Sequence, residues 1–370
     1  MKLTRRWLAA GVLLGALILV GSFSLAEALR TSAAVTRVAI EAASIEAFDN
    51  RDPTRIRFGA LEFRGGLVLT SNDRAFGGIS SLHMEPDGAH FIAITDQGSW
   101  LRGRIVYRDG KPVGVADAEM APMLAWDGKP LASHRWYDVE SLVELDGQFY
   151  AGIERVEKIV RFDFRRFGFA ARGEPIKVPT EFKSFSYNRS LECLAAGPPG
   201  SPLAGALIVV TERSLDAAGN HRSFLLKGEE VARFTVRRSG DFDVSDCTVL
   251  PPSDLLLLER YFSVTGGLGM RIRRIPLAAI KPGALADGAV LIERCEILED
   301  WTRVDNEWIL LRGDRVVRTW RSRLTVYSGL ELRDRLRQTG FTEVSLHGDL
   351  DGAPYGLDSA RLVAVARAGD

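Results

Sequence analysis

The chain has 370 residues, of which 46% are hydrophobic and 26% charged, as expected for a globular protein. Its 48 basic and 48 acidic residues give a formal net charge of zero, which argues against nucleic acid as a partner because such proteins carry a basic excess. Three cysteines are too few for a disulfide framework, and none forms a C-x-x-C or Cys/His pair with metal-ligand spacing.

Residues 1–26 have the layout of a secretory signal peptide. A basic start at Lys2, Arg5 and Arg6 precedes an apolar run that ends at Leu25, with small residues on both sides of Leu25. As an alternative, residues 8–28 are long enough to remain as a membrane anchor. In both cases we expect the rest of the chain to be periplasmic or secreted, with membrane contact only through an uncleaved N-terminal segment.

The next segments predict strands and one long loop. Residues 35–49 alternate between apolar and polar side chains, which indicates an extended lead-in. Residues 57–70 predict two strands around Arg64-Gly65-Gly66, a hairpin that would form half a blade. Residues 109–135 are polar and rich in Gly and Pro, which predicts a long loop. His134 in this loop could overhang a site, although a lone loop histidine is more often solvated.

Four stretches repeat one structural unit, namely residues 77–105, 137–164, 188–226 and 242–275. Each has a short first strand, a turn, an apolar second strand that ends on an acidic residue, and a third strand. A unit of this kind that recurs at roughly fifty residues is typical of a β-propeller blade. The sequence therefore predicts a mainly β, propeller-like fold with four clear blades, an N-terminal half blade and a small α+β C-terminal segment.

Charged residues recur at the same positions of these units. The superposed first strands carry Ser80, Glu140, Glu192 and Asp246. The second strands end on Asp96, Glu154, Glu212 and Glu259. In three units the residue that follows is an arginine, namely Arg155, Arg213 and Arg260. Because the first strands of a propeller line its central channel, we expect both sets of acids to gather at one mouth of the channel.

Converging carboxylates repel one another unless cations neutralise them. A hard divalent ion such as Ca²⁺ would do so, with the second-strand acids as its ligands. The arginines would otherwise pair with the acids and leave some guanidinium groups to bind an anionic substrate. On this hypothesis Glu140, Glu192 and Asp246 are catalytic. The alternative is that the repeated acid–arginine pairs only fasten neighbouring blades.

Two cysteines follow the first-strand acids of adjacent units. Cys193 comes directly after Glu192, and Cys247 comes directly after Asp246. They could form a disulfide in an oxidising compartment. The favoured interpretation is that both are buried and unbonded, because free cysteine is often buried as a small apolar residue.

The repeated motifs resemble a known family. The set FGGIS…DGAHFIAITDQG, WYDVESL…YAGIERV, NRSLECLA…VTERSLDAAGN and FDVSD…LLLLERYFS…MRIRRIPLAAIKPG is similar to the family described as having esterase-like activity of phytase. The resemblance covers about residues 57–292. It implies a secreted or periplasmic propeller that hydrolyses a small-molecule ester or phosphate ester.

Residues 293–370 depart from this pattern and resemble the C-terminal end of a Rossmann-like methyltransferase that uses S-adenosylmethionine. They predict strands over 300–326, a helix with Ser328 as N-cap that ends at Gly340, and a strand pair at 341–347 and 359–368. The chain has no Gly-x-Gly motif followed by a helix, so we expect no binding of S-adenosylmethionine.

The sequence therefore predicts three parts: a signal peptide at 1–26, a phytase-like propeller at 35–292 and a methyltransferase-like segment at 293–370. The favoured function is an exported hydrolase of esters or phosphate esters at a channel mouth lined by carboxylates and arginines, with Ca²⁺ as the candidate cofactor. The alternative is a non-catalytic propeller that binds a ligand or partner outside the cytoplasm, and methyl transfer comes third.

Overall fold

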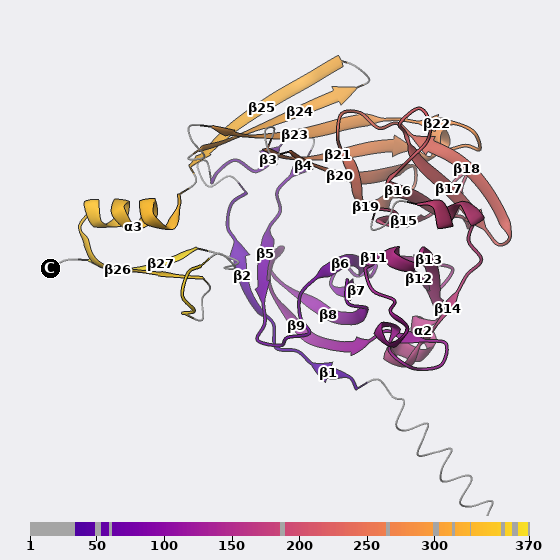
Figure 1. Cartoon of the computed structure of the whole chain (residues 1–370), viewed down its shortest axis with the longest axis horizontal. Helices are drawn as coiled ribbons and strands as arrows, with labels where there is room; N and C mark the ends of the chain where they lie inside the picture. Colours follow the sequence, from indigo (N-terminus) through magenta and orange to yellow (C-terminus); the bar gives the residue numbers. More distant parts are fainter. Residues whose placement is uncertain are drawn as a thin grey trace, which may run out of the picture.

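We describe the protein from a computed structural model (Figure 1). The described residues are 34–48, 53–58, 61–185, 189–263, 267–298, 303–312, 315–325, 327–348, 352–356 and 362–368. The predicted signal peptide at residues 1–26 lies outside them. Among the described helices, none combines the length and the apolar character that crossing a bilayer requires.

Four sheets form a four-blade β-propeller arrangement (Figure 1), which confirms the predicted fold class. Blade 1 contains β6 (Ile79–Met84), β7 (His90–Thr95), β8 (Ser99–Arg108), β9 (Lys111–Pro122) and β1 (Thr36–Arg37). Blade 2 contains β11 (Val139–Leu145), β12 (Gln148–Ile153), β13 (Lys158–Phe162), β14 (Arg172–Pro175) and β10 (Leu124–Ala125). Blade 3 contains β15 (Cys193–Ala196), β16 (Leu207–Leu215), β17 (His221–Lys227), β18 (Glu230–Val236) and β22 (Leu285–Ala286). Blade 4 contains β19 (Asp243–Leu250), β20 (Asp254–Ser263), β21 (Gly267–Pro276), β23 (Ala289–Leu298), β24 (Arg303–Arg312) and β25 (Arg315–Thr325).

The N-terminal half blade pairs differently from the expected hairpin. β5 (Gly66–Thr70) pairs with β2 (Glu41–Ile45), whereas β3 (Arg57–Phe58) pairs with β4 (Leu61–Glu62). The predicted hairpin around Gly65 is therefore wrong. Gly65 has a φ of +149°, and a Cβ there would lie 2.7 Å from Pro112 Cδ. This glycine thus allows a close approach to blade 1 instead of forming a turn.

The predicted long loop at residues 109–135 is also wrong in its first half. Asp109 and Gly110 both have positive φ and form a tight turn between β8 and β9. This is the Asp-Gly signal of a two-residue hairpin. β9 then completes blade 1, and its Ala118 and Met120 join the core with Phe91. After β10, a 3-10 helix, η1 (Leu131–His134), leads to blade 2.

The C-terminal region begins as part of blade 4. The boundary predicted after residue 292 falls inside β23, and β24 and β25 continue the same sheet. The remaining predicted elements are confirmed. Helix α3 (Gly329–Gln338) has a capping box in which Ser328 Oγ accepts from the Glu331 N–H and the Glu331 carboxylate accepts from the Ser328 N–H. β26 (Phe341–His347) pairs with β27 (Val363–Ala368).

The core of the propeller lies between neighbouring blades. Apolar clusters fill the spaces between blades 1 and 2, 2 and 3, and 3 and 4. Trp100 of blade 1 is fully buried and meets Phe149 and Phe162 of blade 2 edge to face. Such contacts fix the spacing of the innermost strands and hence the positions of residues at their ends.

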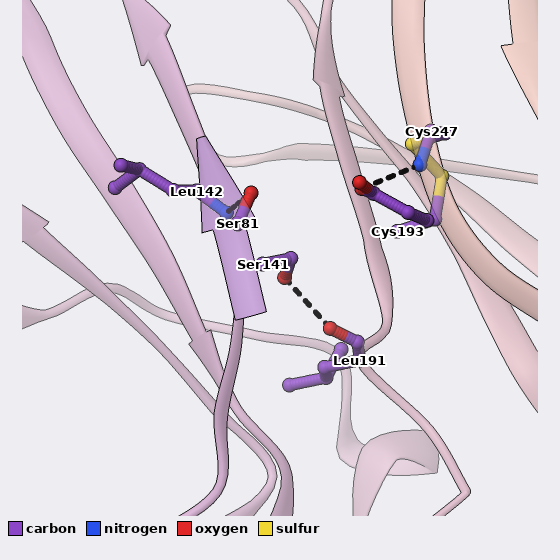
Figure 2. The surroundings of a disulfide bond; sticks show 7 residues. Ser81, Ser141, Leu142, Leu191, Cys193 and Cys247 are labelled. Carbon is purple, nitrogen blue, oxygen red and sulfur yellow. Dashed lines mark hydrogen bonds between the residues drawn. A yellow bond between two sulfur atoms is a disulfide. The ribbon is translucent and has the colours of Figure 1, made fainter. Parts of the chain in front are cut away.

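One position of each innermost strand links neighbouring blades. Ser81 Oγ of β6 accepts a hydrogen bond from the backbone N–H of Leu142 at 3.2 Å. Ser141 Oγ of β11 donates to the carbonyl of Leu191 at 2.7 Å (Figure 2). Ser81 and Ser141 pair with the residue that lies two before the second-strand acid of their own blade. This shared register supports the superposition of the repeats.

The same position in blades 3 and 4 carries a disulfide. Cys193 of β15 and Cys247 of β19 are bonded, with their Cα atoms 5.1 Å apart (Figure 2). The interpretation that both cysteines are unbonded is therefore wrong. Each cysteine pairs with the residue two before the second-strand acid, so equivalent positions of adjacent innermost strands face one another.

Candidate functional site

The first-strand acids lie where the innermost strands begin. β6 and β11 each contain a β-bulge there, and Ser80 and Glu140 are the extra residues. In β19 the extra residue is Ser245, directly before Asp246. Bulges re-aim side chains, and they are frequent next to active sites. Ser80 Oγ donates to the Gly78 carbonyl at 3.3 Å, and burial raises the pKa of the Glu140 carboxyl.

Three carboxylates converge, and they come from both predicted sets. Oxygen atoms of Glu154, Glu192 and Glu212 all lie within 4.8 Å of one another. Glu154 follows β12, Glu192 precedes β15 and Glu212 lies in β16. The group therefore spans blades 2 and 3, and Glu154 and Glu212 are buried. We call these three residues the carboxylate cluster.

Burial and mutual repulsion raise the pKa values of acids in the carboxylate cluster. Burial, followed by the charges of Glu140, Glu212 and Glu154, raises the pKa of Glu192 to about 9. Burial and the neighbouring carboxylates also raise the pKa of Glu154 to about 7. The charged forms of these groups are therefore unfavourable in the folded chain, as expected for acids that share a desolvated site.

Arg260, one of the three repeated arginines, contacts the cluster. It comes from β20 of blade 4, and its Nη2 lies 3.5 Å from Glu192 and 3.4 Å from Glu212. Its side chain remains 58% exposed, so part of the guanidinium group faces solvent. Arg260 can therefore bind an anionic group while it partly neutralises the cluster.

The other two arginines pair with aspartates, and one of these pairs fits the alternative that such pairs fasten neighbouring blades. Arg155 Nε lies 2.5 Å from Asp138 Oδ2, within the second unit. Arg213 of blade 3 pairs with Asp243 of blade 4. The Arg213 pair joins neighbouring blades, which is the structural role that repetition of such pairs suggests.

Two further residues complete the site, and the repeat pattern does not identify them. The Ser190 backbone N–H donates to Glu154, and Ser190 Oγ donates to Glu157 Oε2 at 2.7 Å. Burial raises the pKa of Glu157 to about 7. The sequence signal for Ser190 is its place two residues before Glu192, and no repeated position marks Glu157.

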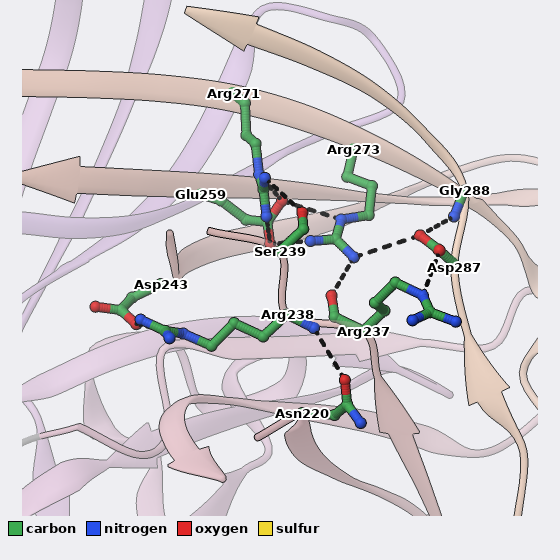
Figure 3. A network of polar contacts seen from close by, with 10 residues as sticks. All are labelled: Asn220, Arg237, Arg238, Ser239, Asp243, Glu259, Arg271, Arg273, Asp287 and Gly288. Atoms are coloured by element: carbon green, nitrogen blue, oxygen red, sulfur yellow. Dashed lines mark hydrogen bonds and ion pairs between the residues drawn. The ribbon is translucent and has the colours of Figure 1, made fainter. Parts of the chain in front are cut away.

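Glu259 does not join the second tier that the repeats predict. It is fully buried, with its Oε2 2.7 Å from Arg271 Nε and its Oε1 2.6 Å from Arg273 Nη2 (Figure 3). Although burial alone would raise the pKa of Glu259, the two guanidinium groups outweigh it and lower the pKa. Arg271 and Arg273 point to the same face of β21 because they are two residues apart. The expectation that Glu259 lies with Glu154 and Glu212 is therefore wrong.

Asp96 and Asp246, like Glu140 and Glu259, lie outside the carboxylate cluster. Asp96 packs against Gly78, and its charge contributes to the raised pKa of Glu140. Asp246 Oδ1 accepts from the Cys247 N–H at 2.7 Å, and burial raises the pKa of Asp246 to about 6.

Comparison with known proteins identifies the family. The family model described as phytase-like, with esterase-like activity of phytase, matches residues 74–306. No curated protein matches the sequence.

Solved structures show similarity at low identity. Dihydro-heme d1 dehydrogenase NirN in complex with DHE is 13% identical with a TM-score of 0.34, over 65% of this chain and 46% of NirN. Sqt1 of Saccharomyces cerevisiae is 12% identical with a TM-score of 0.34, over 71% of this chain and 76% of Sqt1. The RRP9 WD40 repeats are 11% identical with a TM-score of 0.30, over 65% of this chain and 78% of theirs. The chain thus spans less than half the length of NirN.

The family match covers more than half of the chain and most of the four blades. It begins at residue 74 and extends to residue 306, beyond the resemblance expected for residues 57–292. The chain belongs to the phytase-like family, described as having esterase-like activity of phytase.

Proposed function

We propose that the protein is an exported hydrolase that cleaves an ester or phosphate ester bond at the carboxylate cluster. The observation that carries this proposal is the convergence of Glu154, Glu192 and Glu212 beside the half-exposed Arg260. Membership of the phytase-like family supports hydrolysis as the reaction. A buried group of coupled acids next to an arginine is the arrangement expected of an acid–base site for an anionic substrate.

The donor set of the cluster fits a hard divalent cation such as Ca²⁺. Calcium takes carboxylate oxygens at about 2.3–2.6 Å, so two ligands of one ion lie at most about 5 Å apart. The separation of no more than 4.8 Å among the three carboxylates meets this limit. Glu154, Glu192 and Glu212 would hold the ion. When bound, it would supply positive charge that stabilises the negative charge developing on the substrate.

The neighbouring residues supply the rest of the chemistry. Arg260 would orient the phosphate or carboxylate group through its exposed guanidinium edge. Glu140 would take a proton from the attacking water, because its raised pKa brings it closer to the ordinary range of a general base. Asp246, whose pKa is raised to about 6, is the second candidate for this role.

Two features support a location outside the cytoplasm. Residues 1–26 have the layout of a signal peptide. The disulfide between Cys193 and Cys247 is of the kind that persists in the periplasm or after secretion and is rare in the cytosol.

The test is hydrolysis of p-nitrophenyl acetate and p-nitrophenyl phosphate, with and without Ca²⁺. We expect turnover by the purified protein and a loss of at least about 100-fold in Glu140→Gln and Glu192→Gln. Glu174→Gln is the matched control, since Glu174 is exposed on blade 2 and pairs only with Arg161 among the described residues. Absence of turnover under all conditions would overturn the proposal and favour a non-catalytic binding propeller.

A further inference from the structure

Three aromatic rings cluster between blades 1 and 2, and one of them is half exposed. The ring of Trp126 lies 4.5 Å from that of His134 and 5.3 Å from that of Trp136, measured between centroids. The rings of His134 and Trp136 are 6.0 Å apart. We call these residues the aromatic shelf. Trp136 is buried at 6% exposure, whereas Trp126 is 50% exposed and offers its indole to solvent.

The polar groups at the aromatic shelf are already engaged with one another. Asp127 Oδ1 lies 3.1 Å from His134 Nε2 and accepts from the Lys129 backbone N–H at 3.1 Å. The ammonium group of Lys129 lies 3.6 Å from the second carboxylate oxygen of Asp127. These contacts fix the His134 ring in place against Trp126. They also engage the hydrogen-bonding groups that a sugar ligand would contact, which disfavours a sugar as the ligand of the aromatic shelf.

Positive charge lies beside the aromatic shelf. The ammonium group of Lys158 is 5.5 Å from the ring centroid of Trp136. Arg135, between His134 and Trp136, is exposed. The charge next to the aromatic shelf is therefore positive, which favours a ligand that carries a negative charge.

The backbone around the shelf is held in an unfavourable conformation. Arg135 has a φ of +59° and Asp138 a φ of +56°, so two non-glycine residues in the left-handed region flank Trp136. Glu157, directly before Lys158, is a third, with a φ of +51°. Such residues persist where the surrounding structure enforces them, and they concentrate at ligand-binding and active sites.

One short turn connects the aromatic shelf to the carboxylate cluster. The 3-10 helix η2 (Glu154–Val156) places Glu154 in the cluster, and its Arg155 pairs with Asp138. After η2, the Lys158 ammonium group lies over the ring of Trp136, so the segment that begins at Glu154 also contacts the aromatic shelf. Asp138 also contributes to the raised pKa of Glu140. The aromatic shelf and the carboxylate cluster are therefore joined through consecutive residues of blade 2.

We propose that the aromatic shelf binds the aromatic ring of a negatively charged aryl ester or aryl phosphate, by stacking on Trp126. The assignment of this ligand as substrate rests on the proposed function, whereas binding of the ring does not. The exposed indole supplies a stacking face, and Lys158 and Arg135 supply the charge that complements the anionic group.

Calorimetry with phenylphosphonate and methylphosphonate tests this inference, because neither compound can be hydrolysed as an ester. We expect phenylphosphonate to bind roughly fivefold to tenfold more tightly than methylphosphonate. Trp126→Ala should remove this preference, and Trp126→Phe should retain part of it. Lys158→Met should weaken binding of both compounds. Phe167→Ala is the control, because Phe167 is 52% exposed on blade 2 with the Arg166 guanidinium 4.9 Å from its ring.

Equal affinity for the two phosphonates, or an unchanged preference in Trp126→Ala, would overturn the proposal, as would a failure of phenylphosphonate to bind. Loss of the preference in both Trp126→Ala and Phe167→Ala would also count against it. The two proposals fail separately. A Trp126-dependent preference without ester turnover would support the aromatic shelf as a binding site and overturn the proposed hydrolase function. Ester turnover with no effect of Trp126→Ala on phosphonate binding would support the hydrolase function and overturn the binding role of the aromatic shelf.

Discussion

Removal of the disulfide between Cys193 and Cys247 is expected to destabilise the propeller and its site together. The bond closes a loop with a sequence separation of 54 residues. In the chain-entropy model, a loop of this length corresponds to about 4 kcal/mol of free energy of unfolding. Alanine is the suitable replacement, because Cys193 is fully buried and alanine introduces no polar group there.

The site should respond because the disulfide lies next to it in the chain. Glu192 directly precedes Cys193, and Arg260 crosses from blade 4 to contact Glu192 and Glu212 of blade 3. If blades 3 and 4 separate slightly, Arg260 withdraws from the carboxylate cluster. We therefore expect Cys193→Ala/Cys247→Ala to lose ester turnover under conditions in which it remains folded.

Urea unfolding followed by circular dichroism measures the stability. The oxidised protein should unfold at a higher urea concentration than either the reduced protein or Cys193→Ala/Cys247→Ala, and the last two should agree. Glu174→Gln serves as the control variant, because Glu174 is exposed, and it should match the unmodified protein. Equal unfolding midpoints with and without reductant, or three free thiols by mass spectrometry of the oxidised protein, would refute the reasoning.

Two further predictions concern buried charge. Glu259→Gln should lower the free energy of unfolding by about 3–5 kcal/mol, because it removes the carboxylate that Arg271 and Arg273 share in the core and leaves Arg273 only Asp287, 3.6 Å from its Nη1. A thermal melt equal to that of Glu174→Gln would contradict this. Glu192 has a pKa of about 9 in the folded protein, against an ordinary value of 4.5. Its contribution to the free energy of unfolding is therefore fully present below pH 4.5 and is lost as the pH rises towards about 9. The melting temperature should therefore fall from about pH 5 to about pH 9, less steeply in Glu192→Gln, and an equal slope in both proteins would count against the coupling.

Repetition allowed much of the fold to be predicted, because equivalent residues of successive blades occupy equivalent places. The superposition that aligned Glu140 with Glu192 also aligned Cys193 with Cys247, yet whether two such cysteines bond depends on the spacing of adjacent innermost strands. The sequence predicts a loop over β9 because Gly and Pro residues are typical of loops. Which residues of β9 are buried is decided by its pairing with β8.

The site shows where repetition stops being informative. A Glu-Arg pair ends the second strand in both blade 3 and blade 4. In blade 4, however, Glu259 forms ion pairs with Arg271 and Arg273 of β21. Conversely, Ser190 and Glu157 lie in segments outside the strands, where no repeated position marks them. The identity of the acids could be predicted from sequence, whereas their partners depend on strand pairing and loop geometry.

Titration of the purified protein with Ca²⁺ by calorimetry, in buffers of different ionisation enthalpy, tests the central claim most directly. If Glu154, Glu192 and Glu212 hold one cation, one Ca²⁺ should bind per chain at neutral pH with release of protons, because the pKa values of about 7 for Glu154 and about 9 for Glu192 require deprotonation. Glu192→Gln should bind more weakly and release fewer protons, and Glu174→Gln should behave as the unmodified protein does. No binding, or binding that is equal in Glu192→Gln, would contradict the claim that these three carboxylates form a cation-dependent hydrolytic site.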